Sequence, residues 1–429
     1  MNLVTLPAKD QWPALLQRPV PDRSAILAAT RAVLEVVRLE GDAALIRYTE
    51  KFDGVKTGSL LVTADEVRGA GSAISDTLKQ AMETAVSNIR CFHAAQKREM
   101  KPVVTTPGVV CWQKTLPVEK VGLYIPGGSA PLFSTLLMLA TPAQIAGCNE
   151  IILCTPPGKE LNGTIHPAVL YAAMLCGVTR IYKIGGAQAI AAMAYGTESV
   201  PKVDKIFGPG NAYVTAAKQL VQLDGVAIDL PAGPSELCVL ADDTANPEYI
   251  AADLLAQAEH GPDSQVLLVT DSADLAGKVK EAVYRQLISL PRQSIAEKSL
   301  AASKLIVAAD MEEAMELVNA YAPEHLLIIC REEERMAGLV RHAGSVFLGP
   351  YTPESLGDYA SGTNHTLPTD GYARVYSGVG LDHFCKTISF QRAGFEGLQN
   401  LGPAVITMAE AECLSGHARS VSIRLNNHN

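Results

Sequence analysis

The spacing of apolar residues changes at about residue 120, and this change divides the chain into parts of different construction. Before it, apolar residues recur every three or four positions, as in Ala29, Val33 and Val37, which predicts helices across 22–99. After it, short apolar runs alternate with stretches of helical length. Such alternation is typical of a parallel sheet with helices on both faces.

The short apolar runs fall into two consecutive sets of predicted strands. The first set comprises 121–125, 151–154, 180–184, 205–207 and 226–228, and the second comprises 237–240, 265–269, 305–307, 326–330 and 345–348. The helices between them are expected near 131–146, 168–175, 187–195, 211–222, 247–259, 273–289, 310–320 and 332–341. We therefore predict an α/β protein with two similar, incomplete Rossmann-like parallel-sheet domains and helical N- and C-terminal segments.

These patterns also set the expected domain boundaries. We expect an N-terminal segment at 1–21, a first α/β domain formed by 22–120 with 237–380, a second at 121–236, and a C-terminal helical segment at 381–429. Within them, the Gly-, Ser-, Thr- and Pro-rich stretch 351–380 is expected to be an ordered loop region, and 391–414 to be helical. The segment 157–167 looks like a variable surface loop, with no role indicated by the sequence.

Composition narrows the class of protein. The chain has 429 residues, a formal net charge of −9 and no basic run, which argues against binding to nucleic acid or an anionic membrane surface. Its most apolar stretch, 132–148, is too short and too interrupted to span a bilayer. The nine cysteines show no CxxC spacing, and the first residues lack the features of a secretory signal. We therefore expect reduced thiols and a cytoplasmic location.

Glycine-rich turns follow several of the predicted strands. Gly208-Pro209-Gly210-Asn211 lies between a strand and a helix, the context of phosphate binding at a helix N-terminus, and Asp229 ends the next strand, where a ribose-binding acid could be. Taken alone, a tight strand-to-helix turn explains this segment better. Similar turns at 122–128 and 185–188 make one ligand crevice at the carboxyl ends of these strands the better explanation of all three.

Three constellations of polar residues could carry chemistry. Gln257 and His260 lie three apart on the last turn of a predicted helix, which Gly261-Pro262 ends, and could begin a metal site. Glu324 and His325 open an apolar strand as a potential acid/base pair, although for one such pair taken alone a helix-to-strand turn with a structural histidine is the better explanation. The third constellation lies nearer the C-terminus.

This third group comprises Asp358 with His365 and Glu412 with His417. The first two lie in a polar loop that could equally be an ordinary surface loop. The second two are expected at the C-terminal end of a helix, where a histidine also suits the helix dipole.

Taken together in chain order, these segments resemble histidinol dehydrogenases. The resemblance extends from about residue 25 to His417 and is carried by the motifs VGLYIPGGSAPLFSTLLMLATPAQIAGC, IGGAQAIAA, VPKVDKIFGPGNAYV, IDLPAGPSE, LLAQAEHGPDSQ, YAPEHL, AGSVFLG and PESLGDYASGTNHTLPT. It implies oxidation of L-histidinol to L-histidine through L-histidinaldehyde by two NAD-dependent steps, with one zinc ion per site. It also implies a homodimer in which the C-terminal segment crosses to the partner and the sites are shared.

The resemblance also implies a role for each matching residue. The zinc ligands would be Gln257, His260, Asp358 and His417; the catalytic pair would be Glu324 and His325; and NAD would contact Tyr124, Gln188 and Asn211. The substrate would contact Ser235, His365 and Glu412, together with the zinc ligands and His325.

Two alternatives stay open at this stage. One is a related zinc- and NAD-dependent dehydrogenase of another small amino- or hydroxy-alcohol, against which Glu354, His365 and Glu412 favour the histidinol site. The other is a zinc-stabilised binding protein without redox activity. Reduction of NAD by L-histidinol distinguishes both from the favoured hypothesis.

Overall fold

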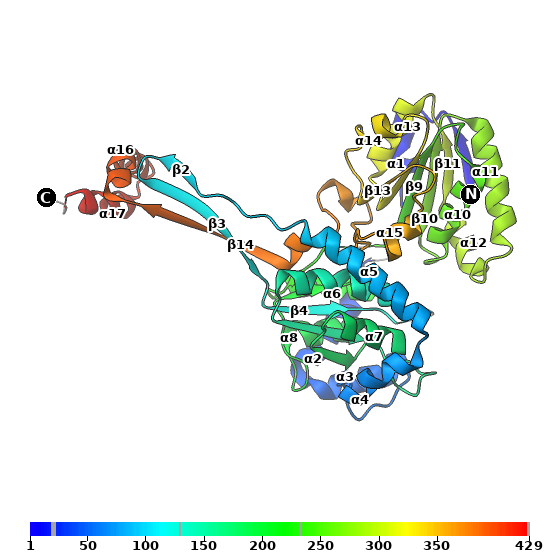
Figure 1. The fold of residues 1–429 in the computed structure, drawn as a ribbon, viewed down its shortest axis with the longest axis horizontal. Coiled ribbons are helices and arrows are strands. Elements are labelled where there is room, and N and C mark those ends of the chain that lie inside the picture. Colours follow the sequence, from blue (N-terminus) through cyan, green and yellow to red (C-terminus); the bar gives the residue numbers. More distant parts are fainter. Residues whose placement is uncertain (19–22, 128–129, 232, 427–429) are drawn as a thin grey trace. The chain divides into compact units, whose positions relative to one another are not determined.

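The computed structural model describes residues 1–18, 23–127, 130–231 and 233–426. It divides into two compact units, Met1–Ala95 with Val118–Phe384 and Gln96–Pro117 with Cys385–Asn429. The first unit contains two parallel sheets and the second a small antiparallel one (Figure 1). Among the described residues, no helix is both long and apolar enough to cross a membrane.

The larger sheet of the first unit has six parallel strands. Their order is β1 (Asn2–Thr5), β11 (Lys304–Val307), β10 (Gln265–Thr270), β9 (Glu236–Ala241), β12 (His325–Ile329) and β13 (Ser345–Leu348). Every residue of the central strands β9 and β12 is buried, as expected for apolar strands covered on both faces.

Helices cover both faces of this sheet. On one face lie α10 (Pro247–Ala258), α11 (Ala273–Leu287) and α12 (Gln293–Ala302), and on the other lie α1 (Trp12–Leu15), α13 (Met311–Tyr321) and α14 (Glu333–Ala337). Alternate residues of β9 divide between the two cores, with Leu237 and Val239 facing one and Cys238 and Leu240 the other. A short helix, α15 (Glu354–Tyr359), follows β13 and packs against α10.

The smaller sheet of the first unit has five parallel strands. Their order is β6 (Arg180–Lys183), β5 (Glu150–Thr155), β4 (Lys120–Tyr124), β7 (Lys205–Phe207) and β8 (Ala227–Ile228). One face is covered by α6 (Phe133–Ala146) and α7 (Pro167–Leu175), and the other by α8 (Gly186–Tyr195) and α9 (Ala212–Gln222). The chain builds outward in both directions from β4, so the strand order reverses between β4 and β7.

The N-terminal helices form a second layer over this smaller sheet. They are α2 (Arg23–Glu40), α3 (Asp42–Asp53), α4 (Ala64–Ala70) and α5 (Asp76–Ala94). Contacts join α2 to α8 and α9, α4 to α7, and α5 to α6. This extra layer explains why α6 and α8 are apolar on all sides. These helices belong to the segment 22–120, which was expected to form one domain with 237–380. That grouping stays a prediction, because an apolar helix face does not specify its partner.

The second unit consists of three antiparallel strands and two helices. The strand order is β14 (Cys385–Ala393), β3 (Val109–Pro117) and β2 (Val103–Thr106), followed in the chain by α16 (Phe395–Ala411) and α17 (Ser415–Asn426). In β14 and β3, Phe390 lies opposite Trp112, and the two rings stack at 5.4 Å. Short 3₁₀ turns elsewhere comprise Lys9–Gln11, Gly71–Ala73, Tyr372–Arg374 and Leu381–Phe384.

The α/β architecture predicted from the sequence is confirmed, and so are the ten predicted strands. Several elements were missed: β1, β2, β3, α12 and α15 were not expected, and the helix predicted from residue 391 begins at Phe395, after the strand β14. The strand escaped prediction because most of its residues are exposed in this unit, so it has no continuous apolar run. Helix α15 escaped because it is short and lies in a stretch rich in loop-forming residues.

Candidate active site

The candidate acid/base pair lies at the amino end of the six-stranded sheet. Glu324 immediately precedes β12, His325 is its first residue, and both side chains are buried. The neighbouring strand β9 begins at Glu236, whose backbone N–H donates to Oε2 of Glu324 at 2.8 Å. The carbonyl oxygen of Glu236 lies 3.1 Å from Nδ1 of His325. One residue of β9 therefore holds both members of the pair through its main chain.

The contact with the carbonyl oxygen of Glu236 makes the two ring nitrogens of His325 different. Since a carbonyl oxygen can only accept, Nδ1 carries the proton and donates it to Glu236. The other nitrogen, Nε2, is buried, has no hydrogen-bond partner and lies 3.5 Å from Oδ1 of Asp358. Nε2 is therefore the atom available to take a proton from a substrate.

Two further acids from α15 approach this imidazole. Glu354 and Asp358 are four residues apart and so lie on one face of the helix. Oε1 of Glu354 is 3.6 Å from Nδ1 of His325, and Glu354 is almost completely buried. A chain segment remote in sequence thus supplies two carboxyl groups to the pair on β12.

Burial and charge shift the ionisation of these groups in different directions. Burial lowers the pKa of His325, but the surrounding carboxylates outweigh it and hold that pKa well above its usual value. Burial, reinforced by repulsion from neighbouring acids, raises the pKa of Glu354 well above the ordinary range. Burial also acts to raise the pKa of Asp358, yet the imidazole of His325 outweighs it and lowers that pKa. The chain by itself favours an ionised Asp358 beside a protonated Glu354.

The predicted ligands on α10 lie at the same end of the sheet. Gln257 is fully buried near the end of the helix, and with its amide oriented to suit both neighbours it donates to Oε1 of Glu354 and accepts from the N–H of Glu236 at 2.9 Å. His260 lies two residues beyond the helix, is exposed, and is close enough to Asp358 to lower its pKa.

His365 completes this group within the first unit. Its Nδ1 is 2.8 Å from the carbonyl oxygen of Asp358, and its Nε2 is 3.0 Å from the hydroxyl of Thr135 on α6. Burial lowers the pKa of His365, which favours a neutral imidazole. Nearby, the amide of Asn364 donates to the carbonyl of Met138, also on α6, at 2.6 Å. The polar loop therefore connects the candidate centre to the helices of the smaller sheet.

The centre contains donor atoms suited to a divalent metal. His325, Glu354 and Asp358 each offer an atom within 4.8 Å of the others, and Nε2, Oε2 and Oδ1 of these residues are buried without a hydrogen-bond partner. Nitrogen and carboxylate oxygen are ordinary zinc ligands. This group shares only Asp358 with the ligand set predicted from the sequence, so two overlapping sets are available in one cluster.

The remaining predicted substrate and zinc residues are not all in this cluster. Ser235 lies just before β9, next to Glu236, while Glu412 and His417 belong to the second unit. There Glu412 follows α16, and His417 lies exposed in the first turn of α17. The segment 412–417 follows the C-terminal end of α16 as expected, but His417 itself lies in the first turn of the next helix. A positive charge there would interact unfavourably with the helix dipole, so the dipole does not explain this histidine.

Sequence reasoning missed the support behind the acid/base pair. The guanidinium of Arg18 makes a two-pronged contact with the buried carboxylate of Glu236, with Nη2 2.8 Å from Oε2, and stacks over the ring of Tyr321 at 4.0 Å. Burial raises the pKa of another missed acid, Asp253 on α10, to about 7. Neither residue had a recognisable signal, because Arg18 and Glu236 are 218 positions apart and α10 shows only a helical pattern.

The glycine turns meet at the carboxyl end of the five-stranded sheet. A side chain on Gly127 or Gly185, after β4 and β6, would collide with Pro156, which follows β5. The hydroxyl of Tyr124, the last residue of β4, accepts a hydrogen bond from the N–H of Gly186 at 3.0 Å. Burial raises the pKa of Tyr124 to about 12, so this hydroxyl stays protonated. The turns therefore form one edge rather than separate surface loops.

The other two predicted NAD residues lie at the starts of helices along this edge. Gln188, in the first turn of α8, is buried and its Nε2 has no partner. Asn211 caps α9 by accepting from the N–H groups of Tyr213 and Val214, both at 3.1 Å. The turn after β7 thus has a capped helix N-terminus at the topological switch point, where nucleotides bind in folds of this type.

The carboxylate of Asp229, considered above as a possible ribose-binding acid, is instead used within the fold. Its carboxylate forms a buried ion pair with Lys218 and accepts from the N–H groups of Gly208, at 2.8 Å, and Leu230, at 2.7 Å. Lys218 also donates to the carbonyl of Gly208 at 2.8 Å. The ion pair between Lys218 and Asp229 therefore stabilises the turn after β7 from within the core. Both carboxylate oxygens of Asp229 are buried and already have partners, so they do not face a ligand.

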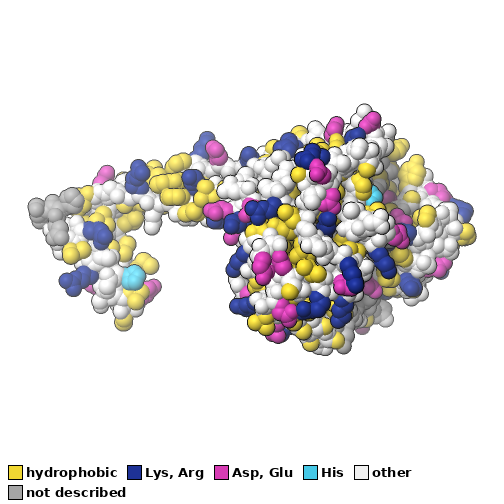
Figure 2. Space-filling view, turned by 90° about the horizontal axis from the view of Figure 1, so that it is seen from below, with side chains coloured by type: hydrophobic (Ala, Val, Ile, Leu, Met, Phe, Trp, Pro, Cys, Tyr) yellow, Lys and Arg dark blue, Asp and Glu magenta, His cyan; other side chains and the backbone are white. Residues whose placement is uncertain are grey.

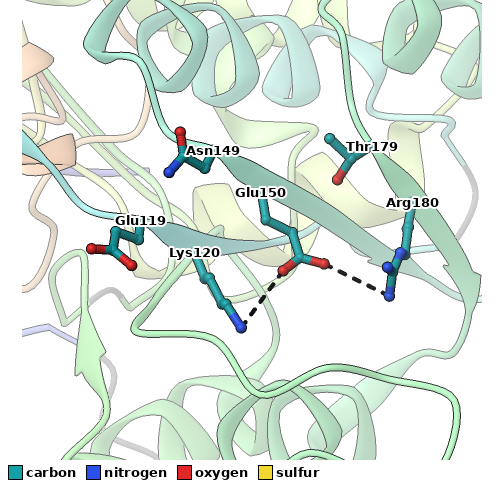
Figure 3. A pocket seen from close by; sticks show the side chains of 6 residues that line it. All are labelled: Glu119, Lys120, Asn149, Glu150, Thr179 and Arg180. Atoms are coloured by element: carbon teal, nitrogen blue, oxygen red, sulfur yellow. Dashed lines mark ion pairs between the residues drawn. The ribbon is translucent and has the colours of Figure 1, made fainter.

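A separate surface pocket lies at the amino ends of β4, β5 and β6. Its lining residues are Glu119, Lys120, Asn149, Glu150, Thr179 and Arg180 (Figure 3). Within it Glu150 faces Lys120 at 3.9 Å and Arg180 at 3.7 Å, so its charges largely compensate one another. The glycine turns lie at the opposite ends of these strands, and the pocket is thus separate from them.

An α/β protein with a buried acid/base centre on one sheet and a glycine-lined edge on another has the parts of a nucleotide-dependent enzyme. The family model of histidinol dehydrogenase matches residues 16–425. The chain is 58% identical to the histidinol dehydrogenase of Bacteroides thetaiotaomicron over 426 residues, 99% of each protein, and 56% identical to that of Vibrio cholerae, covering 97% of this chain and 96% of the relative.

A solved structure gives the same result. The crystal structure of histidinol dehydrogenase from Elizabethkingia anophelis superposes with a TM-score of 0.97 at 52% identity, covering 99% of this chain and 98% of that one. The chain belongs to the histidinol dehydrogenase family and is accordingly an oxidoreductase.

Proposed function

We propose that the protein oxidises L-histidinol to L-histidine through L-histidinaldehyde, with two NAD molecules and one zinc ion per site. The observation that carries this proposal is the buried Glu324–His325 pair, held by the main chain of Glu236 next to a cluster of metal-binding side chains. Overall, L-histidinol, water and two NAD⁺ give L-histidine, two NADH and three protons. The chain must therefore accept protons twice and retain the aldehyde between the two oxidations.

In the first oxidation His325 is the proton acceptor. Its Nε2 has no hydrogen-bond partner, while Nδ1–H is held by the carbonyl of Glu236, so the imidazole can bind the alcohol proton at Nε2. The surrounding carboxylates, which raise the pKa of His325, would stabilise the imidazolium that results. Nε2 takes the proton of the alcohol oxygen while a hydride leaves the carbon that bears this oxygen. The product of this step is L-histidinaldehyde.

In the second oxidation Glu324 activates water. Its Oε2 is held by the N–H of Glu236, and none of the described residues donates to Oε1. Oε1 can therefore accept the proton of a water molecule that adds to the aldehyde. The adduct is the anion of the aldehyde hydrate, and loss of the second hydride from it gives the carboxylic acid.

The proposed zinc ligands are Gln257, His260 and Asp358, with His417 of a second copy as the fourth. Asp358 offers a buried oxygen without a partner, and His260 is exposed yet close to it. This set leaves His325 and Glu354 for proton transfer and support, whereas the overlapping set would consume the proposed base. Bound zinc would hold the amino and imidazole nitrogens of the substrate and so orient the carbon that is oxidised.

Tyr124, Gln188 and Asn211 are the proposed NAD contacts, because all three lie along the glycine-lined edge. NAD would supply the hydride acceptor in both oxidations. Ser235, His365 and Glu412 would complete the substrate site, and the expected location remains the cytoplasm.

A homodimer is proposed because the second unit exposes many large apolar side chains. They are Val103, Val104, Ile388, Phe390, Phe395, Leu401, Val405, Met408, Leu414 and Ile423. Figure 2 shows hydrophobic side chains on the visible face of this unit. Extended apolar patches of this kind are typical of protein interfaces. A segment that crosses to a second copy would place Glu412 and His417 in the partner's site.

The test is NADH formation from L-histidinol before and after chelation of zinc. We expect two NADH per histidinol, complete loss after chelation, recovery with added zinc, and an unchanged far-UV circular dichroism spectrum, because the core is formed without the metal. Activity on another amino alcohol but not on L-histidinol would favour the related dehydrogenase. Bound zinc without any NAD reduction would contradict the proposal.

A further inference from the structure

Asp53, the last residue of α3, has an unusual environment for a carboxylate. Its Oδ2 is buried, and none of the described residues forms a hydrogen bond or an ion pair with the side chain. The position at the C-terminal end of a helix adds unfavourable dipole interaction. Burial alone raises the pKa of Asp53 to about 6, with no compensating contact. An acid that only destabilises the folded chain requires a functional explanation.

Asp53 lies next to the glycine turns at the end of the five-stranded sheet. Its Oδ1 is 3.2 Å from the point that a Cβ on Gly185 would occupy, and Pro156 is 2.6 Å from the same point. Gly185 joins β6 to α8, and its neighbour Gly186 donates to the hydroxyl of Tyr124. Helix α3 therefore brings a carboxylate from outside the sheet to the edge along which the proposed NAD contacts lie.

Gln188 supplies a hydrogen-bond donor without a partner near the carboxylate of Asp53. Gln188 is 1% exposed, its Nε2 has no hydrogen bond, and its amide oxygen lies 2.7 Å from the point that a Cβ on Gly186 would occupy. Next to a single turn, Gly185–Gly186, the chain thus holds an acceptor, Asp53, and a donor, Gln188, that have no partner among the described residues. Two adjacent hydroxyl groups satisfy both, since each hydroxyl can donate to a carboxylate and accept from an amide.

We propose that Asp53 receives the hydroxyl groups of the adenosine ribose of NAD and thereby excludes the 2′-phosphate of NADP. The inference rests on the proposed use of NAD. The adenosine ribose is favoured over the other because the nicotinamide must reach the acid/base pair on the six-stranded sheet, whereas Asp53 and Gln188 belong to the smaller sheet and its helices. A carboxylate at this place would repel a phosphate and leave it without a donor from Asp53.

The experiment compares Asp53→Asn with wild type by calorimetric titration of the full-length, zinc-loaded enzyme. The probes are NAD⁺, NADP⁺ and ADP, of which ADP contains the adenosine ribose alone. We expect Asp53→Asn to weaken both NAD⁺ and ADP about tenfold or more, as for loss of a charge-assisted hydrogen bond, and to narrow the preference for NAD⁺ over NADP⁺ by a similar factor. Glu50→Gln, an exposed acid on the same helix, is the matched control and should change none of these.

The outcomes separate this inference from the proposed function. Unchanged NAD⁺ and ADP affinities in Asp53→Asn, with a wild type that binds NAD⁺, would overturn the inference alone. Weaker NAD⁺ with unchanged ADP would also overturn it, because the contact would then lie on the nicotinamide ribose. A wild type that binds no NAD⁺ would instead contradict the proposed function. A merely structural role predicts loss of thermal stability without a change in the NAD⁺ to NADP⁺ preference.

Discussion

The Nδ1 atom of His325 lies 3.5 Å from Oε2 of Glu324, although the two residues are neighbours in the chain. Successive side chains of a strand point to opposite faces, so two adjacent strand residues could not meet in this way. They meet here because β12 begins at His325 and Glu324 lies outside it. The N–H of Glu236 then holds the glutamate in place. Adjacent residues can therefore serve one substrate in two successive proton transfers.

Replacement of each partner should impair a different oxidation. His325→Asn removes the acceptor of the alcohol proton, and Glu324→Gln removes the group that activates water. We expect His325→Asn to slow NADH formation from L-histidinol at least about a hundredfold and to retain more activity with L-histidinaldehyde. Glu324→Gln should slow aldehyde oxidation by a similar factor. If Glu324→Gln oxidises the aldehyde at the wild-type rate, its assigned role is wrong.

The fold was largely predictable because its strands are buried on both faces. Central strands such as β9 and β12 contain continuous apolar runs, and the runs alternate with helices, a pattern that admits few arrangements. The strand β14 was not predictable, since most of its residues are exposed in this unit. The association of α2 with α8 was not predictable either. Each helix has an apolar surface, but the sequence does not indicate which two apolar surfaces pack together.

The candidate site was predictable only where its residues share a short segment. Gln257 and His260, or Glu324 and His325, could be singled out from spacing and later gained meaning from a family resemblance. The buried contact between Arg18 and Glu236 had no such signal, as it joins distant parts of the chain. Asp229 was considered as a ribose-binding acid, but its buried ion pair with Lys218 excludes this role. The position of an acid at the end of a strand does not reveal whether the acid has a buried partner.

Metal content should distinguish the two overlapping ligand sets. His260→Ala removes a ligand of the proposed set, so we expect loss of zinc and of activity with an unchanged circular dichroism spectrum. Glu354→Gln is nearly isosteric and replaces a carboxyl that burial already keeps protonated, so zinc should stay bound. Elemental analysis after dialysis measures both variants. Zinc lost from Glu354→Gln but kept by His260→Ala would assign the metal to His325, Glu354 and Asp358 instead.

The buried pair Lys218–Asp229 should matter for stability more than for NAD binding. Asp229→Asn leaves an unpaired ammonium group in the core, so we expect the free energy of unfolding to fall by about 3–5 kcal/mol. The double variant with Lys218→Met should recover part of this loss. Urea unfolding measures the stability. An unchanged unfolding curve together with weaker NAD⁺ binding would restore Asp229 as a ribose-binding acid.

Asp53 should make the wild type less stable as the pH rises. Burial raises its pKa to about 6, so between about pH 4 and pH 6 the folded chain holds a proton that the unfolded chain has already lost. The contribution of Asp53 to the free energy of unfolding therefore falls as the pH rises through that interval, and it stays at the lower value at higher pH. Because the side chain is only partly buried, the effect should be about 1 kcal/mol. Urea midpoints of the NAD-free wild type and Asp53→Asn should diverge across this range and stay parallel above it; constant separation would contradict the prediction.

Subunit complementation should reveal whether the second unit completes its own site or that of a partner. Consider His325→Asn and His417→Ala, each nearly inactive alone. In a shared-site dimer of one copy of each, one site collects both defects, while the other combines an intact His325 with an intact His417. Random reassembly of equal amounts makes half of the dimers mixed, and each carries one good site, so about a quarter of wild-type activity should return. If His417 served its own subunit, every site would keep one defect. Activity that stays at the level of the separate variants, with mixed dimers shown to be present by mass spectrometry, would therefore rule out the shared site.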